Sequence, residues 1–140
     1  MQTFLPYADF EKTAASLDMK RLGKQRVETM QIVKTILTPD QRGWQNHPAV
    51  NMWRGYLGAL LDYQTAICYE WVVNRGYKDT CLEKTEALLH NHPLTDDYPD
   101  WLGDSEIHTS HQSNLVKKDP IFYKAVFPNV PDNIEYVWPV

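Results

Sequence analysis

Long apolar runs and paired cysteines are absent from this sequence. No stretch approaches the roughly 20 uninterrupted apolar residues of a membrane-spanning helix. The opening MQTFLPYADFEK carries acids where a signal peptide would have a basic start and a long apolar run. The two cysteines, Cys68 and Cys81, do not form a CxxC pair and cannot make a disulfide framework. We therefore expect a soluble, cytoplasmic protein that does not enter a membrane.

Sheet patterns and glycine-rich phosphate-binding motifs are also missing. The sequence has no GxGxxG, no P-loop pattern, no internal repeat and no long alternation of β-branched residues. Its 140 residues are 43% hydrophobic and 12% aromatic, which is enough for one packed core and short for two. The prediction is an all-α fold in a single compact domain over residues 1–140, with about four to six helices around one long central helix.

A basic balance, which is typical of nucleic-acid-binding proteins, is absent as well. The formal net charge is −4. The acidity is local, because the segment from Glu83 to Glu106 holds seven acids and one lysine, so that the rest of the chain sums to +2. The segment KRLGKQR, from Lys20 to Arg26, carries four cations and no acid. Such a dipolar molecule can present a basic face to a polyanion.

The chain is predicted to be organised around a helix from Leu17 to Leu37. At 100° per residue, the residues Leu22, Thr29, Met30, Val33, Ile36 and Leu37 share one arc, and a charged face lies opposite. Arg26 falls inside the apolar arc, where an unpaired guanidinium would be costly. It needs an anionic partner, either a carboxylate of the protein or a phosphate of a ligand.

The other helices are predicted from caps and apolar spacing. Asp9 or Asp18 can cap the first helices, and Thr80 with Glu83 has the form of a capping box. The segment 38–46 is a turn-rich connector, and the aromatic tail after residue 127 is expected to pack on the body. Helices are expected over residues 10–17, 48–74 as the long central element, 80–90, 105–118 and 120–125.

Four residues of the basic helix could carry chemistry. Arg21, Lys24, Gln25 and Glu28 fall at i, i+3, i+4 and i+7 and so share one face. Cations beside one carboxylate suit phosphate binding together with acid–base work or stabilisation of a developing sugar cation. An ordinary solvated helix face would have the same spacing.

Two further groups are candidate contacts for a polyanion. His47, at the predicted start of the long helix, could either bind an anion there or only cap the helix. Lys117 and Lys118 are followed by Phe122 and Tyr123, and cations next to rings suit phosphates with an unstacked base. His108 and His111 are spaced i, i+3, but the histidines and cysteines fit none of the usual zinc templates, so no metal site is predicted.

Several segments together carry a family resemblance. They are MQTFLPYADF, LDMKRLGKQRVE, NHPAVNMWRGY, EWVVNRGYKD, WLGD, HTSHQSNLVKKDPIFY and the terminal YVWPV. In this combination the chain resembles bacterial and phage pyrimidine dimer DNA glycosylases over nearly its whole length. It is more distantly similar to the small phage enzyme endonuclease V.

The resemblance implies an all-helical enzyme without metal or cofactor that binds duplex DNA at a lesion. The distant phage enzyme attacks the deoxyribose C1′ with its N-terminal amine, and an α-amine has an ordinary pKa near ~7.7, against ~10.4 for a lysine. By this resemblance Met1 supplies the amine, because Gln2 is large and should leave Met1 in place. The alternatives are a lysine nucleophile such as Lys20 or Lys24 with a lowered pKa, or a reaction without a covalent step. The acid–base position falls on Glu28 or on Gln25. The phosphate and DNA contacts fall on Arg21, Lys24, Arg26, His47, Lys117, Lys118 and Tyr123.

The leading hypothesis from the sequence is a DNA N-glycosylase with AP-lyase activity that acts as a monomer on damaged or modified pyrimidines in double-stranded DNA. A second hypothesis keeps sugar chemistry but changes the substrate, to nucleotides or hypermodified bases, as a hydrolase or transferase. The third is a non-catalytic DNA-binding module. Steep salt dependence would favour the duplex binder over the nucleotide enzyme.

Overall fold

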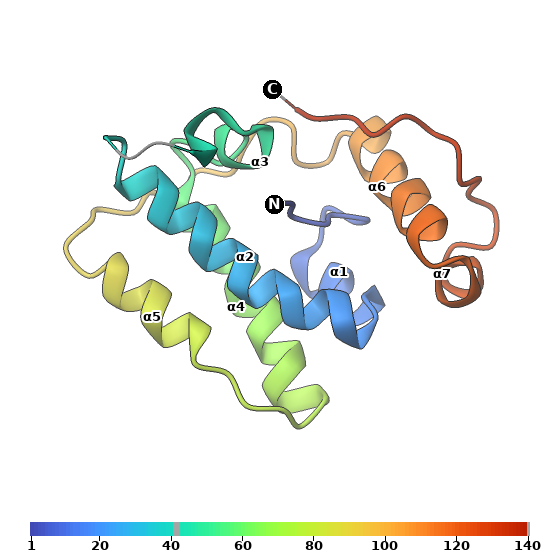
Figure 1. The fold of residues 1–140 in the computed structure, drawn as a ribbon, viewed down its shortest axis with the longest axis horizontal. Helices are drawn as coiled ribbons and strands as arrows, with labels where there is room; N and C mark the ends of the chain where they lie inside the picture. Colours follow the sequence, from blue (N-terminus) through green and yellow to red (C-terminus); the bar gives the residue numbers. More distant parts are fainter. Residues whose placement is uncertain (41–42, 140) are drawn as a thin grey trace.

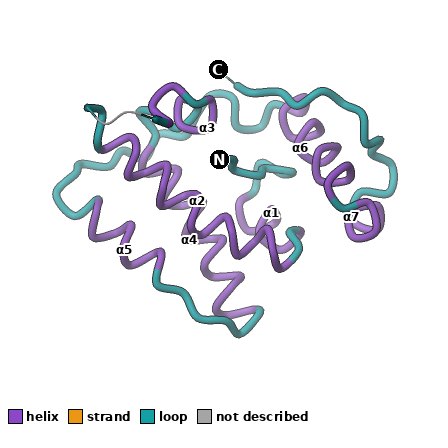
Figure 2. Tube along the Cα trace, in the orientation of Figure 1, coloured by secondary structure: helices purple, strands orange, loops and turns teal. Residues whose placement is uncertain are grey.

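The computed structural model describes residues 1–40 and 43–139, and within them every regular element is helical (Figures 1 and 2). The all-α prediction is confirmed. The turn-rich connector predicted over residues 38–46 includes Gln41 and Arg42, which lie outside the described residues. The described part contains a 3₁₀ turn (Trp44–Asn46), a π-helical turn (Glu70–Asn74) and seven α-helices: α1 (Phe10–Ser16), α2 (Met19–Leu37), α3 (Pro48–Asn51), α4 (Leu57–Tyr69), α5 (Cys81–Leu88), α6 (Ser105–Lys118) and α7 (Pro120–Val126).

The helix α2 lies in the middle of the molecule. It packs on α4 and α5, and the first residues of the chain lie along its other side, between α2 and α6 (Figure 1). The apolar arc predicted for this helix is half-buried or buried throughout: Leu22, Thr29 and Val33 are inaccessible to solvent, and Met30, Ile36 and Leu37 are partly covered. Gly23 allows a close approach, because a Cβ there would lie 2.9 Å from the indole of Trp71.

The predicted long helix over residues 48–74 is wrong, because the chain breaks between α3 and α4. Gly55 adopts a φ of +82°, a left-handed conformation that ends a helix and favours glycine. Trp53, which belongs to the predicted apolar pattern, lies in this turn and is fully buried. The apolar spacing therefore continues through the turn although the helix does not. The segment after Tyr69 continues as the π-helical turn. As a result, α2 with 19 residues is the longest helix of the described chain.

Aspartates start most of the helices. Asp9 and Asp18 cap α1 and α2, as predicted, by accepting hydrogen bonds from the backbone N–H groups of Lys12 and Arg21. The capping box predicted at Thr80 is wrong. Instead Asp79 accepts hydrogen bonds from Cys81 N at 3.1 Å and Leu82 N at 3.0 Å. A carboxylate satisfies both free N–H groups at once and favours the positive end of the helix dipole.

Both chain ends pack on the helical body. The initial segment, residues 1–7, is extended, and its Phe4 and Leu5 belong to the hydrophobic core. The tail lies along α6, where Ser110 Oγ accepts a hydrogen bond from Val137 N at 3.1 Å and Tyr136 stacks on His111 with ring centroids 4.5 Å apart. The prediction that the tail packs on the body is confirmed. Within the described residues, no helix has the length and apolarity needed to span a membrane.

Candidate active site

The initial segment is held by side chains from three helices. From α6, His108 Nδ1 lies 2.8 Å from Leu5 O, and His111 Nδ1 accepts a hydrogen bond from Leu5 N at 2.9 Å. The two histidines, which are spaced i, i+3 in the sequence, therefore bind both backbone polar groups of one residue, Leu5. From α4, the hydroxyl of Tyr63 donates to Phe4 O at 2.7 Å. These bonds satisfy the polar groups of a buried, non-helical backbone that pairs with no strand among the residues that the structure describes, and they fix its direction.

The third helix is α2, whose Gln25 connects the initial segment to Glu28. Its Oε1 accepts a hydrogen bond from Phe4 N (3.1 Å) and lies 2.8 Å from the Tyr63 hydroxyl, whose single proton is shared between this oxygen and Phe4 O. Its Nε2 donates to Gln2 O (3.1 Å) and to Glu28 Oε2 (3.1 Å). Gln25 is inaccessible to solvent, so both ends of its amide are used within the protein. Gln25 therefore orients both the Glu28 carboxylate and the first residues of the chain.

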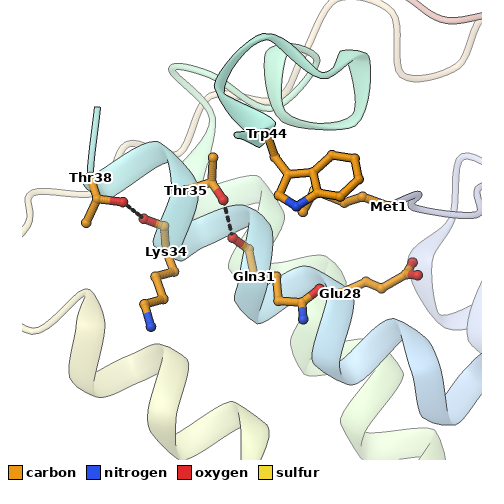
Figure 3. Close-up of a pocket in the computed structure, with 7 residues that line it drawn as sticks. All are labelled: Met1, Glu28, Gln31, Lys34, Thr35, Thr38 and Trp44. Carbon is orange, nitrogen blue, oxygen red and sulfur yellow. Dashed lines mark hydrogen bonds between the residues drawn. The ribbon is translucent and has the colours of Figure 1, made fainter. Parts of the chain in front are cut away.

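Met1 and Glu28 line one cavity of about 350 Å³ (Figure 3). Glu28 Oε2 also accepts a hydrogen bond from Gln2 N at 3.2 Å, so the carboxylate is tied to the residue that follows Met1. Figure 3 shows Trp44 next to Met1, with Glu28 projecting from α2 below them. The remaining lining comes from the end of α2 and the residue after it: Gln31, Lys34, Thr35 and Thr38.

A second, smaller cavity of about 160 Å³ begins on the other side of Glu28. We call it the basic groove. Its cations are Lys20, Arg21 and Lys24 from α2 and Lys118 from the end of α6. Glu28 lines both cavities, so a hollow bordered by Met1 and a carboxylate adjoins one with four cations. A sugar-phosphate group placed over Glu28 would have its phosphate beside those cations.

Arg21 and Tyr123 support the basic groove through Asp18. Asp18 accepts hydrogen bonds from the Tyr123 hydroxyl and from Arg21 Nη1, the latter at 3.3 Å. Although burial opposes the shift, these bonds lower the pKa of Asp18, so it stays an anion that holds Arg21. Tyr123 is fully buried, which places it behind the groove. Lys117 is exposed but lies outside the residues that line either cavity.

Arg26 lies apart from both cavities. Its Nη1 is 2.6 Å from Asp79 Oδ1, and its guanidinium lies 4.5 Å from the centre of the Trp71 ring. Of the two partners predicted for this buried cation, the structure shows the protein carboxylate. Burial raises the pKa of Asp79, but the N–H of Leu82 and the guanidinium of Arg26 more than offset this, so the pKa is lowered.

His47 lies near the N-terminal amine but is occupied as a helix cap. Its Nδ1 accepts a hydrogen bond from Ala49 N at 3.0 Å. Burial and the positive N-terminal amine lower the pKa of His47, which keeps the imidazole neutral and able to accept this bond. Its ring packs edge-on against Trp44 at 5.3 Å and against Trp138 at 5.8 Å. His47 thus supports the aromatic wall of the cavity.

Sequence reasoning missed three parts of this site: Trp44 and Lys34 as residues that border the cavity, and His108 and His111 as residues that hold the initial segment. The i, i+3 spacing of the two histidines was a usable signal, although it did not reveal what they bind. Among the described residues, no group of three or more metal-binding side chains comes together.

Fold and site together define an all-helical protein in which the start of the chain, a glutamate and a cluster of cations meet at adjoining hollows. A family model described as pyrimidine dimer DNA glycosylase matches residues 1–85, and the chain belongs to this family. The match contains Met1, Glu28, the cations of α2 and Trp44, whereas Lys118 lies outside it. Comparisons with curated proteins and with solved structures found no match.

Proposed function

We propose that this protein is a DNA N-glycosylase with AP-lyase activity that removes damaged or modified pyrimidines from double-stranded DNA. The main support is that Met1 and Glu28 line one cavity while Glu28 also lines the basic groove. Family membership supports the substrate class. This arrangement provides the three elements that the reaction needs: an amine, a carboxylate and cations for the phosphates.

In the proposed reaction, the unprotonated α-amine of Met1 attacks C1′ of the deoxyribose. The glycosidic C–N bond breaks, and its electron pair and a proton leave with the base. The sugar ring opens to a Schiff base between C1′ and the amine. Removal of a C2′ proton then breaks the C3′–O bond, with the 3′ phosphate as leaving group. Hydrolysis of the Schiff base returns the free amine.

Glu28 is proposed as the proton acceptor of this sequence. It lines the cavity together with Met1, and its Oε2 is held by Gln2 N and Gln25 Nε2. Two hydrogen bonds from the protein fix the carboxylate before substrate arrives, which is what general-base catalysis requires. Gln25 has no proton-accepting group for this role, and both ends of its amide are already bonded.

Lys24, Arg21 and Lys118 are proposed to bind the phosphates next to the attacked sugar. They line the basic groove directly beyond Glu28, and Lys20 extends the same set. Ion release on binding would make the affinity strongly dependent on salt, as expected of a duplex binder and not of a nucleotide hydrolase.

The test is borohydride trapping of the untagged protein on a duplex that contains one abasic site. We expect a covalent adduct whose modified peptide begins at Met1. The double variant Lys20→Arg, Lys24→Arg keeps the charge but removes both candidate lysine nucleophiles, and it should still be trapped. Glu28→Gln should fold normally and slow strand cleavage by roughly 10²- to 10⁴-fold. An adduct on a lysine would reject the proposed nucleophile, and absence of any adduct, with a lesion-containing duplex left intact, would reject the function.

A further inference from the structure

Trp44 is unusual among the tryptophans of this protein because it is largely exposed and yet lines a cavity. Its side chain is 56% exposed, whereas Trp53 is fully buried in the core. Trp44 borders the 350 Å³ cavity together with Met1 and Glu28, and Figure 3 shows its indole next to Met1. The other side chains of this lining that carry no charge are polar or aliphatic, so the indole is the one aromatic surface among the described residues that border the cavity.

The indole is supported from behind by other rings. His47 packs edge-on against Trp44, Trp138 packs edge-on against His47, and Tyr136 packs against Trp138 with ring centroids 4.7 Å apart. His47 is itself fixed by its bond from Ala49 N. The row of rings reaches from the cavity to α6, where Tyr136 stacks on His111. An aromatic side chain held in this way loses little conformational freedom when it meets a ligand.

We propose that Trp44 stacks on the nucleobase joined to the sugar that Met1 attacks. This inference rests on the proposed glycosylase function and adds a base-recognising residue to it. A base lies one bond from C1′, so a sugar placed between Met1 and Glu28 has its base in the cavity that Trp44 borders. The volume of about 350 Å³ is in the range of cavities that hold small ligands. Every nucleobase has a flat π-face, which an indole can stack against without reading its hydrogen-bonding edge.

A stacking role makes a selective prediction. Stacking requires a base, so it contributes to binding and excision of a lesion but not to the reaction at a site that has already lost its base. Removing the ring should weaken excision by roughly 5- to 100-fold, which is the effect of removing one base–aromatic contact. It should leave trapping on an abasic duplex within about threefold, since stacking on the missing base is no part of that step.

The experiment compares wild type, Trp44→Ala and Trp44→Phe on two duplexes of equal length at one salt concentration. One duplex carries a cyclobutane thymine dimer and the other an abasic site, and both Kd and reaction rate are measured on each. Trp44→Phe keeps a ring and should recover most of the loss on the dimer duplex. Tyr69→Ala removes another largely exposed aromatic, which lies on the π-helical side of the molecule, and should behave as wild type.

The outcomes separate the two proposals. A loss confined to the dimer duplex in Trp44→Ala supports stacking. An equal loss on both duplexes, or no loss in Kd or rate on either, overturns stacking while leaving the lyase proposal intact. If wild type traps the abasic duplex and does not excise the dimer, a weaker Kd of Trp44→Ala for the dimer duplex alone still supports stacking, and an unchanged Kd overturns it. A wild type that is not trapped on the abasic duplex rejects the proposed function itself.

Discussion

The two sides of α2 hold their cations in different ways. On the side of α5, Arg26 is 2.6 Å from Asp79 and lies against Trp71, so its charge is neutralised within the protein. On the side of the initial segment, Lys20 and Lys24 line the basic groove and form no ion pair within residues 1–40 and 43–139. One short basic sequence therefore supplies both a structural cation and cations that are available to a ligand.

This difference shows that local charge density does not identify a phosphate site. Arg26 and Lys24 are two positions apart and equally cationic, but α2 turns them to opposite surroundings. The deciding feature is whether a carboxylate from another part of the chain reaches the cation. Stability should therefore depend on Arg26 and ligand binding on Lys24, and substitutions can test this separation.

The largest effect is expected from Arg26→Met. Removing the guanidinium leaves the nearly buried carboxylate of Asp79 without its cation, and we expect a loss of about 3 kcal/mol in the free energy of unfolding. Urea denaturation measures this loss. Lys24→Met is the matched control and should stay within about 0.5 kcal/mol of wild type. If Arg26→Met were as stable as wild type and bound DNA more weakly, the two sides of the helix would not differ as described.

The next effect develops gradually with acid, through the residue that holds the initial segment on the open side of α2. Burial, with a contribution from His108, lowers the pKa of His111 from 6.5 to about 3. Between these values the unfolded chain binds one more proton than the folded one, so stability falls as the pH is lowered. The slope from this residue is about 1.4 kcal/mol per pH unit at most.

The variant His111→Asn tests this slope, because an amide oxygen can still accept the bond from Leu5 N but does not titrate. Urea denaturation between pH 6.5 and pH 4 should show a flatter dependence in the variant than in wild type. The exposed His92→Asn is the control and should keep the slope of wild type. Equal slopes in all three proteins would show that His111 does not govern acid stability.

The smallest effect on stability, with a clear effect on binding, is expected from Lys24→Met and Lys118→Met. Each should lower the slope of log K against log salt for a duplex by about 1, because one phosphate contact is lost. The melting temperature should hardly change. Lys78→Met, which removes an exposed lysine beside Asp79 on the other side of the molecule, should leave the salt slope unchanged. An equal change in all three variants would indicate a general charge effect and no defined groove.

Local patterns predicted α2 well and the next helices less well. The apolar arc from Leu22 to Leu37 and the cap at Asp18 depend on neighbouring residues, so the sequence contains them directly. The break near Gly55 could not be predicted, because apolar residues continue at helical spacing through a turn whose shape depends on where Trp53 is buried. The choice of Asp79 over Thr80 as a cap depends on Arg26, which is 53 residues away.

The candidate site likewise has one part that the sequence predicts and another that it does not. The shared face of Arg21, Lys24 and Glu28 follows from helical spacing. The contacts that fix the chain start do not, because Leu5 and His111 are 106 residues apart and no local pattern relates them. Trp44 is similarly unmarked in the sequence, since an exposed tryptophan becomes notable only when a cavity is found beside it.

The long separation between Leu5 and its two histidines has a consequence for biosynthesis. The segment that presents the proposed amine leaves the ribosome more than 100 residues before α6, whose His108 and His111 fasten it. A nascent chain that has made only α1 to α5 has Glu28, the lysines of α2 and the bonds from Gln25 and Tyr63, but it lacks the two histidines that bind Leu5. The initial segment can therefore be fully fastened only late in translation, and a product truncated before α6 would hold it through α2 and α4 alone.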